Sequence, residues 1–288
     1  SNIFGHEFGY DRAHSLLMAH SLFGKLPKHP RSIDVGVLMK DGSLRSVGNY
    51  SEFFILMEKI EGQEYCKDLE RIRDEKKLTN LDLQRSQALS DYLVDIHNLK
   101  KDSPELYRRR IRELLGHGEC IMGLIDSYPS KLDFTTDEEL ALIEKKCVEW
   151  RWKLKNRTDR LCQVHGDYHP WNVLFGKGSE LSVLDRSRGE WGEPADDIAA
   201  MTINYLFFSL QAYGSLEGPF KTLYEKFLTN YMEKTGDQEV LGVIQPYYVW
   251  RALVVASPIW YPDLGYDVRR KLFNFIHSVL ASERFDLN

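Results

Sequence analysis

The chain has 288 residues, of which 43% are hydrophobic and 28% are charged, and its formal net charge is −5. This composition is typical of globular proteins and excludes disordered and collagen-like chains. The sequence has no block dense in Lys and Arg, no apolar run near the roughly 20 residues of a membrane helix and no secretion leader. We therefore expect a cytoplasmic protein whose partners include neither nucleic acid nor membranes.

The first part of the chain is predicted to be rich in strands. Residues 11–23 place apolar side chains at helical spacing, and a glycine and a proline follow them. Residues 34–39 and 43–47 flank Asp41-Gly42, which is a strong hairpin signal. Residues 52–60 form an almost unbroken apolar run, as expected of a buried central strand.

The second part is predicted to be mainly helical. The strand-rich domain spans residues 1–62 and the helical domain spans residues 63–288, joined by a hinge near residues 58–62. The fold class is therefore α+β. The expected helices cover residues 81–99, 104–115, 136–154, 195–210, 218–234, 239–257 and 267–282, and short strands cover residues 161–164, 172–175 and 181–184.

The four cysteines are Cys66, Cys120, Cys147 and Cys162. No two of them form a Cys-x-x-Cys pair, which excludes a zinc knuckle or a thioredoxin-type site at the level of motifs. We expect reduced, mostly buried thiols.

The chemistry is concentrated in the segment VHGDYHPWNVLF at residues 164–175. This segment places Asp167 and Asn172 in a short loop between two strands, and the next strand ends directly in Asp185. Phosphoryl transfer from a nucleotide needs a carboxylate that orients the attacking hydroxyl and oxygen ligands that hold Mg²⁺ against the phosphates. These three residues supply one base and two ligands for a hard cation.

The motif HGDYHPWN, the Asp185 that follows it and the later segment GEPADDIA at residues 192–199 resemble the aminoglycoside phosphotransferase/choline kinase-like family. Residues 53–62 are similar to the family's last strand and hinge of the N-terminal lobe, and residues 93–99 are similar to the end of one of its helices. The resemblance thus extends over most of the chain. It implies the bilobal fold of the protein kinases.

The resemblance also assigns roles to individual residues. It implies that Asp167 is the catalytic base and that Asn172 and Asp185 bind Mg²⁺. The expected substrates are ATP or GTP as phosphoryl donor and a small molecule with a hydroxyl group as acceptor. The nucleotide base is expected at the hinge residues Glu58, Lys59 and Ile60, and His165, His169 and Asp197 are expected to brace the loop.

Two departures from the family pattern stand out. The chain begins at what resembles the family's first N-lobe helix, so the N-lobe is expected to be incomplete at its start, without the strands that carry the phosphate-covering loop and the nucleotide-binding lysine. After Asp185 the family usually has an aromatic and then an acidic or polar residue. Here Arg186 and Arg188 follow, which we expect to place two cations near the phosphate site.

Other interpretations of the same residues remain open. His165, Asp167 and His169 also fit the His-x-Asp-x-His pattern of metal hydrolases, although no second ligand cluster is found. A catalytically silent kinase-like binding protein and a kinase acting on a protein hydroxyl are the alternative functions. The aromatic segment at residues 257–263 is a candidate wall for the acceptor, and Asp133, Asp196 and Asp263 are candidate partners for a cationic one or ordinary solvated charges.

Overall fold

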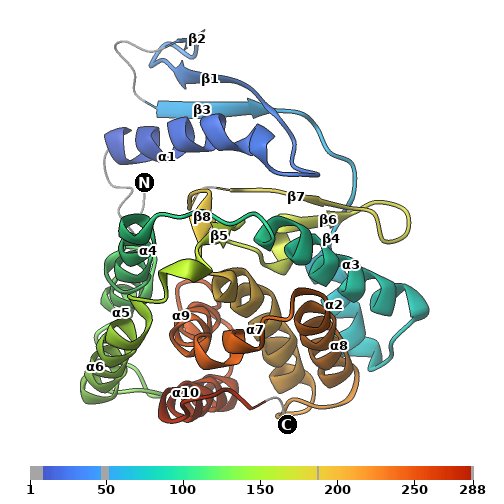
Figure 1. Ribbon diagram of the computed structural model, residues 1–288, viewed down its shortest axis with the longest axis vertical. Helices are drawn as coiled ribbons and strands as arrows, with labels where there is room; N and C mark the ends of the chain where they lie inside the picture. The colour runs from blue at the N-terminus through green and yellow to red at the C-terminus, as the bar shows by residue number, and fades with distance from the viewer. Residues whose placement is uncertain (1–8, 47–51, 187, 287–288) are drawn as a thin grey trace.

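A computed structural model describes residues 9–46, 52–186 and 188–286 of the chain. It shows an α+β protein in which a small part made of one helix and one sheet lies above a much larger helical body (Figure 1). No helix within the described ranges combines the length and the apolar character that a membrane crossing requires.

The upper part consists of α1 (Gly9–Leu22) and an antiparallel sheet of order β2-β1-β3. The strands are β1 (Ser32–Leu38), β2 (Leu44–Arg45) and β3 (Glu52–Met57), and α1 packs against β1 and β3. This packing creates a small apolar core, separate from the main one. Its members are Ala13 and Val37, with Leu16 and Met39 against them.

The predicted hairpin is confirmed, because β1 pairs with β2 across a turn at Asp41-Gly42. Gly42 has φ +80°, a left-handed conformation that glycine adopts without steric cost, and the Asp41 carboxylate accepts a hydrogen bond from the Ser43 backbone N–H at 2.9 Å. The prediction of a buried strand through residue 60 is partly wrong. The strand β3 ends at Met57 and leaves Leu56 52% exposed, since α1 covers only one face of the sheet.

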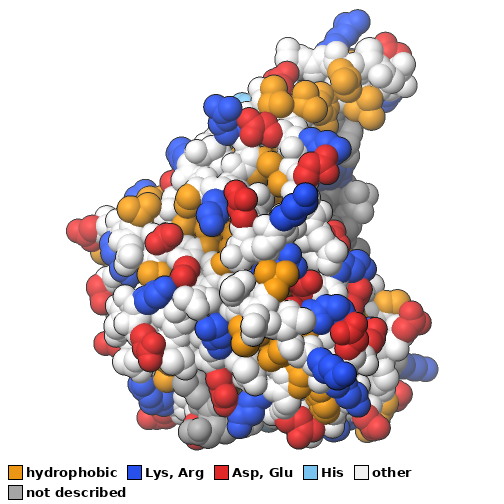
Figure 2. Space-filling view, turned by 90° about the vertical axis from the view of Figure 1, so that its right-hand side faces the viewer, with side chains coloured by type: hydrophobic (Ala, Val, Ile, Leu, Met, Phe, Trp, Pro, Cys, Tyr) orange, Lys and Arg blue, Asp and Glu red, His pale blue; other side chains and the backbone are white. Residues whose placement is uncertain are grey.

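Hydrophobic side chains consequently gather on the upper part of the surface (Figure 2). The exposed large hydrophobic residues of the upper sheet include Ile33, Leu38, Leu44 and Leu56.

The body is built from helices around one continuous apolar core, with all four cysteines buried. Its short strands form a β4-β6-β7 sheet and a β5-β8 pair. The strands are β4 (Gln63–Glu64), β5 (Cys162–Gln163), β6 (Val173–Phe175), β7 (Leu181–Val183) and β8 (Trp191–Gly192). The helices are α2 (Tyr65–Glu75), α3 (Asn80–His97), α4 (Pro104–Gly116), α5 (Ile121–Ser127), α6 (Asp137–Leu154), α7 (Pro194–Ala212), α8 (Gly218–Thr235), α9 (Gln245–Ala256) and α10 (Tyr266–Ala281).

The predicted helices are confirmed with small shifts at their ends, and one of them is divided. Residues 239–257 form a short 3₁₀ helix, η4 (Gln238–Gly242), followed by α9. Pro246 lies in the first turn of α9, where its missing N–H costs nothing and its fixed φ suits the start of a new helix.

Candidate active site

The loop between β5 and β6 is fixed from below by the first turn of α7. The Asp197 carboxylate accepts hydrogen bonds from the backbone N–H groups of His165 and Gly166, both at 2.7 Å, and its Oδ2 lies 3.2 Å from His97 Nε2. Burial of Asp197 would raise its pKa, but the hydrogen bond with His97 and the contacts with His165 lower it. Asp197 therefore remains an anion that holds the loop backbone.

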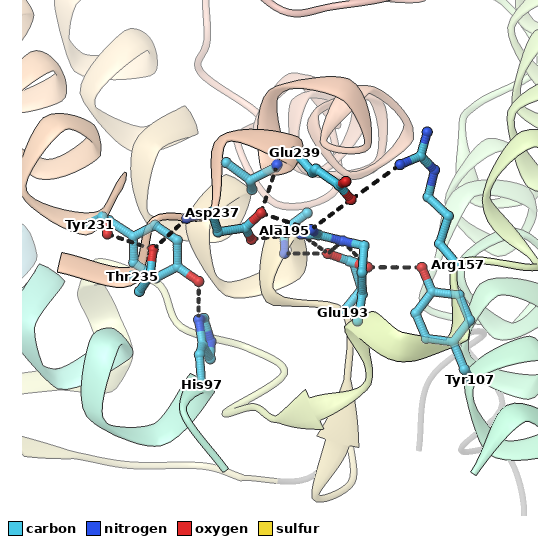
Figure 3. Close-up of polar contacts among 11 residues, drawn as sticks. His97, Tyr107, Arg157, Glu193, Ala195, Tyr231, Thr235, Asp237 and Glu239 are labelled. Atoms are coloured by element: carbon cyan, nitrogen blue, oxygen red, sulfur yellow. Dashed lines mark hydrogen bonds and ion pairs between the residues drawn. The ribbon is translucent and has the colours of Figure 1, made fainter. Parts of the chain in front are cut away.

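A polar network continues from this point through the body (Figure 3). His97 Nδ1 lies 2.9 Å from the Tyr231 hydroxyl. Further along, the buried Arg160 contacts Glu193 at 2.7 Å and Asp237 at 2.8 Å, and the Tyr107 hydroxyl donates to Glu193 Oε2 at 2.8 Å. Since Glu193 is the N-cap residue of α7, this network fixes the helix whose first turn holds the loop.

Asp167 lies within the loop among positive groups. Its Oδ1 accepts a hydrogen bond from Arg251 Nη1 at 2.6 Å, while its Oδ2 lies 3.5 Å from Arg188 Nε and 3.8 Å from His169 Nε2. The residue is 9% exposed. Burial alone would raise its pKa, but the charges of Arg188, His169 and Arg251 outweigh burial and lower it, so Asp167 is a carboxylate at neutral pH.

Arg251 is the site residue that the sequence interpretation missed. Besides Asp167, its guanidinium contacts the Gly166 carbonyl at 3.1 Å and Asp196 Oδ1 at 2.7 Å. Burial raises the pKa of Asp196 to about 6 although Arg251 acts in the opposite direction. One signal was present in the sequence: Arg251 is the only charged residue of the apolar helix α9 (QPYYVWRALVVA).

Asn172 and Asp185 lie at the same end of the β6–β7 hairpin. The Leu184 N–H donates to the Asn172 carbonyl at 2.8 Å, which ties the backbones beside the two residues together. The Asn172 side-chain amide nitrogen donates to the Asp167 backbone carbonyl at 3.1 Å. This bond uses the nitrogen of the amide and leaves its oxygen as the atom that could bind a metal ion. Asp185 adopts a left-handed backbone with φ +56°, an uncommon state for a residue other than glycine.

This donor set fits Mg²⁺, because amide and carboxylate oxygens are the hard ligands that the ion prefers. Burial lowers the pKa of His169, whereas the Asp167 and, more weakly, the Asp185 carboxylates act to raise it, so both carboxylates act on the same imidazole. The described residues contain no cluster of three or more His, Cys, Asp or Glu side chains around a metal position.

His165 and His169 occupy different environments. His165 is fully buried, and its Nδ1 accepts the Asp167 backbone N–H at 3.2 Å. His169 is partly exposed; its backbone N–H donates to the Asp167 carbonyl at 3.0 Å, and its ring lies 5.8 Å from that of Trp171. His165 thus binds the backbone N–H of Asp167, and His169 binds its backbone carbonyl.

The burial of His165 predicts a pH dependence of stability. Burial lowers its pKa from 6.5 to about 4, so the unfolded chain binds this proton more readily than the native one. The contribution of neutral His165 to the free energy of unfolding is therefore fully present above pH 6.5. It is lost as the pH falls toward 4, by up to about 1.4 kcal/mol per pH unit. Urea unfolding across this range measures the slope, to which His29 and His169, whose pKa values are also lowered, add in the same direction. A His165→Gln variant should show a shallower slope; an unchanged slope would contradict the assignment.

The side chains of Arg186 and Arg188 contact different parts of the protein. The expectation that both lie near the phosphate site is therefore wrong for Arg186. Arg188 lies at Asp167, as described above. Arg186 is fully buried and donates to the carbonyls of Val164 at 3.0 Å, Glu190 at 3.0 Å and Leu22 at 3.3 Å. These bonds connect the end of α1 at Leu22 with the backbone directly after β5 at Val164 and directly before β8 at Glu190. Ser187 between the two arginines lies outside the described residues.

The residues predicted to form the hinge follow the end of β3. The Glu58 N–H donates to the Arg31 carbonyl at 3.5 Å, the Glu58 carboxylate pairs with the Arg31 side chain at 3.1 Å, and Lys59 Nζ lies 2.6 Å from Glu61 Oε1. The backbone groups of Lys59 and Ile60 make no hydrogen bond to other described residues. They are therefore available to a ligand, whereas the Glu58 N–H is already engaged.

Comparison with solved structures identifies the fold. An ethanolamine kinase from Plasmodium vivax is 14% identical, with 97% of this chain and 73% of that chain covered and a TM-score of 0.52. A glucosamine kinase in complex with glucosamine, ADP and inorganic phosphate is 14% identical over 92% and 71% of the two chains (TM-score 0.51). An aminoglycoside-3'-phosphotransferase of type VIII is 17% identical over 82% and 78% (TM-score 0.51). The chain thus has the protein kinase-like fold of these phosphotransferases.

The family follows from the sequence itself. The model of the phosphotransferase enzyme family (APH) matches residues 24–221, which is more than half of the chain. The chain therefore belongs to this phosphotransferase family, which confirms the resemblance found in the motifs. A search of curated proteins gave no match.

Proposed function

We propose that this chain transfers the γ-phosphoryl group of ATP or GTP to a hydroxyl group of a small molecule in a Mg²⁺-dependent reaction. The observation that carries the proposal is that Asp167, Asn172 and the strand end before Asp185 are joined by hydrogen bonds. The Asn172 side chain bonds the backbone of Asp167, and its own backbone is tied to the strand end that precedes Asp185. Family membership supports the same reaction class.

In this proposal Asp167 is the residue that meets the acceptor. Its ionised carboxylate accepts the O–H of the acceptor and takes the proton as the new P–O bond forms and the bond to the β-phosphate breaks. Because its pKa is lowered, its main contribution is to orient the hydroxyl, with proton transfer late in the step. Asn172 and Asp185 would hold Mg²⁺, which when bound offsets the negative charge of the phosphates.

The nucleotide base is assigned to the hinge between the two proposed lobes, residues 1–62 and 63–288. The Lys59 and Ile60 backbone groups offer a donor and an acceptor of the kind that a purine edge satisfies, and the Glu58 carbonyl belongs to the same segment. Gly62 beyond the hinge passes close to the body: a Cβ there would lie 3.0 Å from the Phe175 carbonyl oxygen. This close approach fixes where the hinge joins the β4-β6-β7 sheet.

The acceptor is assigned to the side of Asp167 that faces His169. A run of aromatic contacts leads outward from there, from His169 to Trp171, and from Trp171 to Tyr261 with ring centroids 6.3 Å apart. Tyr261 belongs to the non-helical aromatic segment at residues 257–263 and also packs on Phe207 at 4.9 Å. The similarity of the fold to an ethanolamine kinase and to a glucosamine kinase bound to glucosamine supports an acceptor of small size.

Binding of a Mg²⁺–nucleotide complex tests the proposal directly. We expect ADP or GDP with Mg²⁺ to raise the melting temperature and EDTA to abolish this rise, since a ligand of the native state stabilises it. Asp185→Asn should weaken this binding at least about tenfold, or about 1.4 kcal/mol, because the carboxylate that offsets the charge of the metal is lost. Asp95→Asn, an exposed substitution on α3, is the matched control.

A screen of hydroxyl compounds for nucleotide-dependent phosphorylation then identifies the acceptor. A protein that binds Mg²⁺–nucleotide but transfers phosphate to neither small molecules nor protein hydroxyls would be the silent binding protein. Binding that is equal in Asp185→Asn and the wild type would contradict the metal assignment.

A further inference from the structure

We infer that Arg251 is a positioning residue that holds Asp167 in its working orientation and anchors it to α7 through Asp196. The inference rests on the proposed function, because it concerns the orientation of the proposed base. It is based on three hydrogen bonds that the Arg251 guanidinium donates, to the Asp167 carboxylate, the Gly166 carbonyl and the Asp196 carboxylate.

The geometry leaves one oxygen of Asp167 for the acceptor. Arg251 Nη1 donates a hydrogen bond to Asp167 Oδ1 at 2.6 Å. The charged groups beside Oδ2 are farther away, with Arg188 Nε at 3.5 Å and His169 Nε2 at 3.8 Å. Neither of these meets Oδ2 at normal hydrogen-bond distance. An acceptor hydroxyl would thus approach Oδ2, and Arg251 fixes the rotation of the carboxylate that presents it.

Arg251 is itself held on its other sides. Its second terminal nitrogen donates to Asp196 Oδ1 at 2.7 Å, and its guanidinium lies 3.7 Å from the centre of the Trp250 ring. The side chain is only 6% exposed. Asp196 and Asp197 are neighbours in α7, so the loop is held twice by the same turn: its backbone directly by Asp197, and its carboxylate by Asp196 through Arg251.

A lysine cannot reproduce this arrangement. The planar guanidinium donates to Asp167 and Asp196 in fixed directions, whereas an ammonium is a point charge on a flexible stem. Arg270 on α10 provides a matched control. It is partly buried and donates to the Phe134 carbonyl at 2.6 Å and to Glu139 Oε2 at 2.9 Å, and it makes no hydrogen bond with a described residue of the loop or of the segment at residues 257–263.

The test compares Arg251→Lys with Arg270→Lys in the full chain. We expect Arg251→Lys to lower kcat at least about tenfold, for the identified acceptor or for slow nucleotide hydrolysis, with KM for the nucleotide unchanged. Arg251→Ala should regain part of the lost kcat when methylguanidinium is added. Arg270→Lys should lower the melting temperature without changing kcat. Equal kcat in Arg251→Lys and the wild type would overturn the inference.

A second measurement needs no activity. If Arg251 holds Asp167, the losses of melting temperature in Asp167→Asn and Arg251→Met are not additive, and the double variant melts close to the lower single variant. Additive losses would overturn the pairing. If the wild type transfers no phosphoryl group, the proposed function fails, and the additivity measurement alone then decides whether Arg251 holds Asp167.

Discussion

Replacement of Asp167 with Asn should lower the rate of phosphoryl transfer by about 10²–10⁴-fold, the usual contribution of a positioned base. The amide keeps the shape of the side chain but loses the charge that orients and deprotonates the acceptor. Nucleotide affinity should change little, because Asp167 lies on the acceptor side of the proposed site. Rates of nucleotide-dependent phosphorylation and a thermal-shift titration with Mg²⁺–ADP separate the two effects.

The comparison with Asp185→Asn makes this prediction specific. The first variant should lose turnover and keep nucleotide binding, whereas the second should lose nucleotide binding itself. Transfer that is indifferent to Asp167→Asn would show that the chemistry belongs to another residue.

The second large effect concerns stability. Glu193→Ala should lower the free energy of unfolding by about 3–5 kcal/mol, since it removes a fully buried partner of Arg160 and leaves the guanidinium with Asp237 and the more distant, exposed Glu239. Burial would lower the pKa of Arg160, but Glu193 and Asp237 raise it, so the arginine remains charged. The Tyr107 hydroxyl also loses its acceptor. Urea unfolding measures the loss.

Glu239→Ala is the matched control from the same network (Figure 3). Glu239 pairs with Arg157 at 3.3 Å and lies 3.8 Å from Arg160, but its side chain is 65% exposed, so the change should stay below about 1 kcal/mol. The double variant Arg160→Met with Glu193→Leu should be more stable than Glu193→Ala, because both fully buried charges are then removed together and only the partly exposed Asp237 loses a partner. A Glu193→Ala loss as small as that of the control would contradict the prediction.

The sequence was sufficient to predict those elements whose signals are local. The hairpin at Asp41-Gly42, the cap of α6 at Thr136 and the start of α4 at Pro104 all depend on residues within one turn of the feature. The end of β3 was misjudged because an apolar run gives no information on which face the rest of the chain covers. The division of residues 239–257 was missed for a similar reason: apolar spacing continues across it, and only Pro246 marks the new start.

The same distinction applies to the site. Asp167 and Asn172 lie five residues apart, so one motif predicts both of them, and the next strand end predicts Asp185. Arg251 lies 84 positions after Asp167, and the contact exists only because α9 packs against α7 in the folded body. A lone charge in an apolar helix indicates a buried partner but does not name it. The direction of Arg186 could not be predicted either, since its neighbour Arg188 has the same charge and a different environment.

Arg186 also restricts how this chain can change. Its guanidinium makes two hydrogen bonds to the Val164 carbonyl and single ones to the carbonyls of Glu190 and Leu22. A phenylalanine at this position would supply no donor and a tyrosine or tryptophan only one, so a single substitution would remove at least three of the four bonds from a buried site. Such a residue becomes tolerable only after the end of α1 and the backbone at Val164, directly after β5, have been repacked.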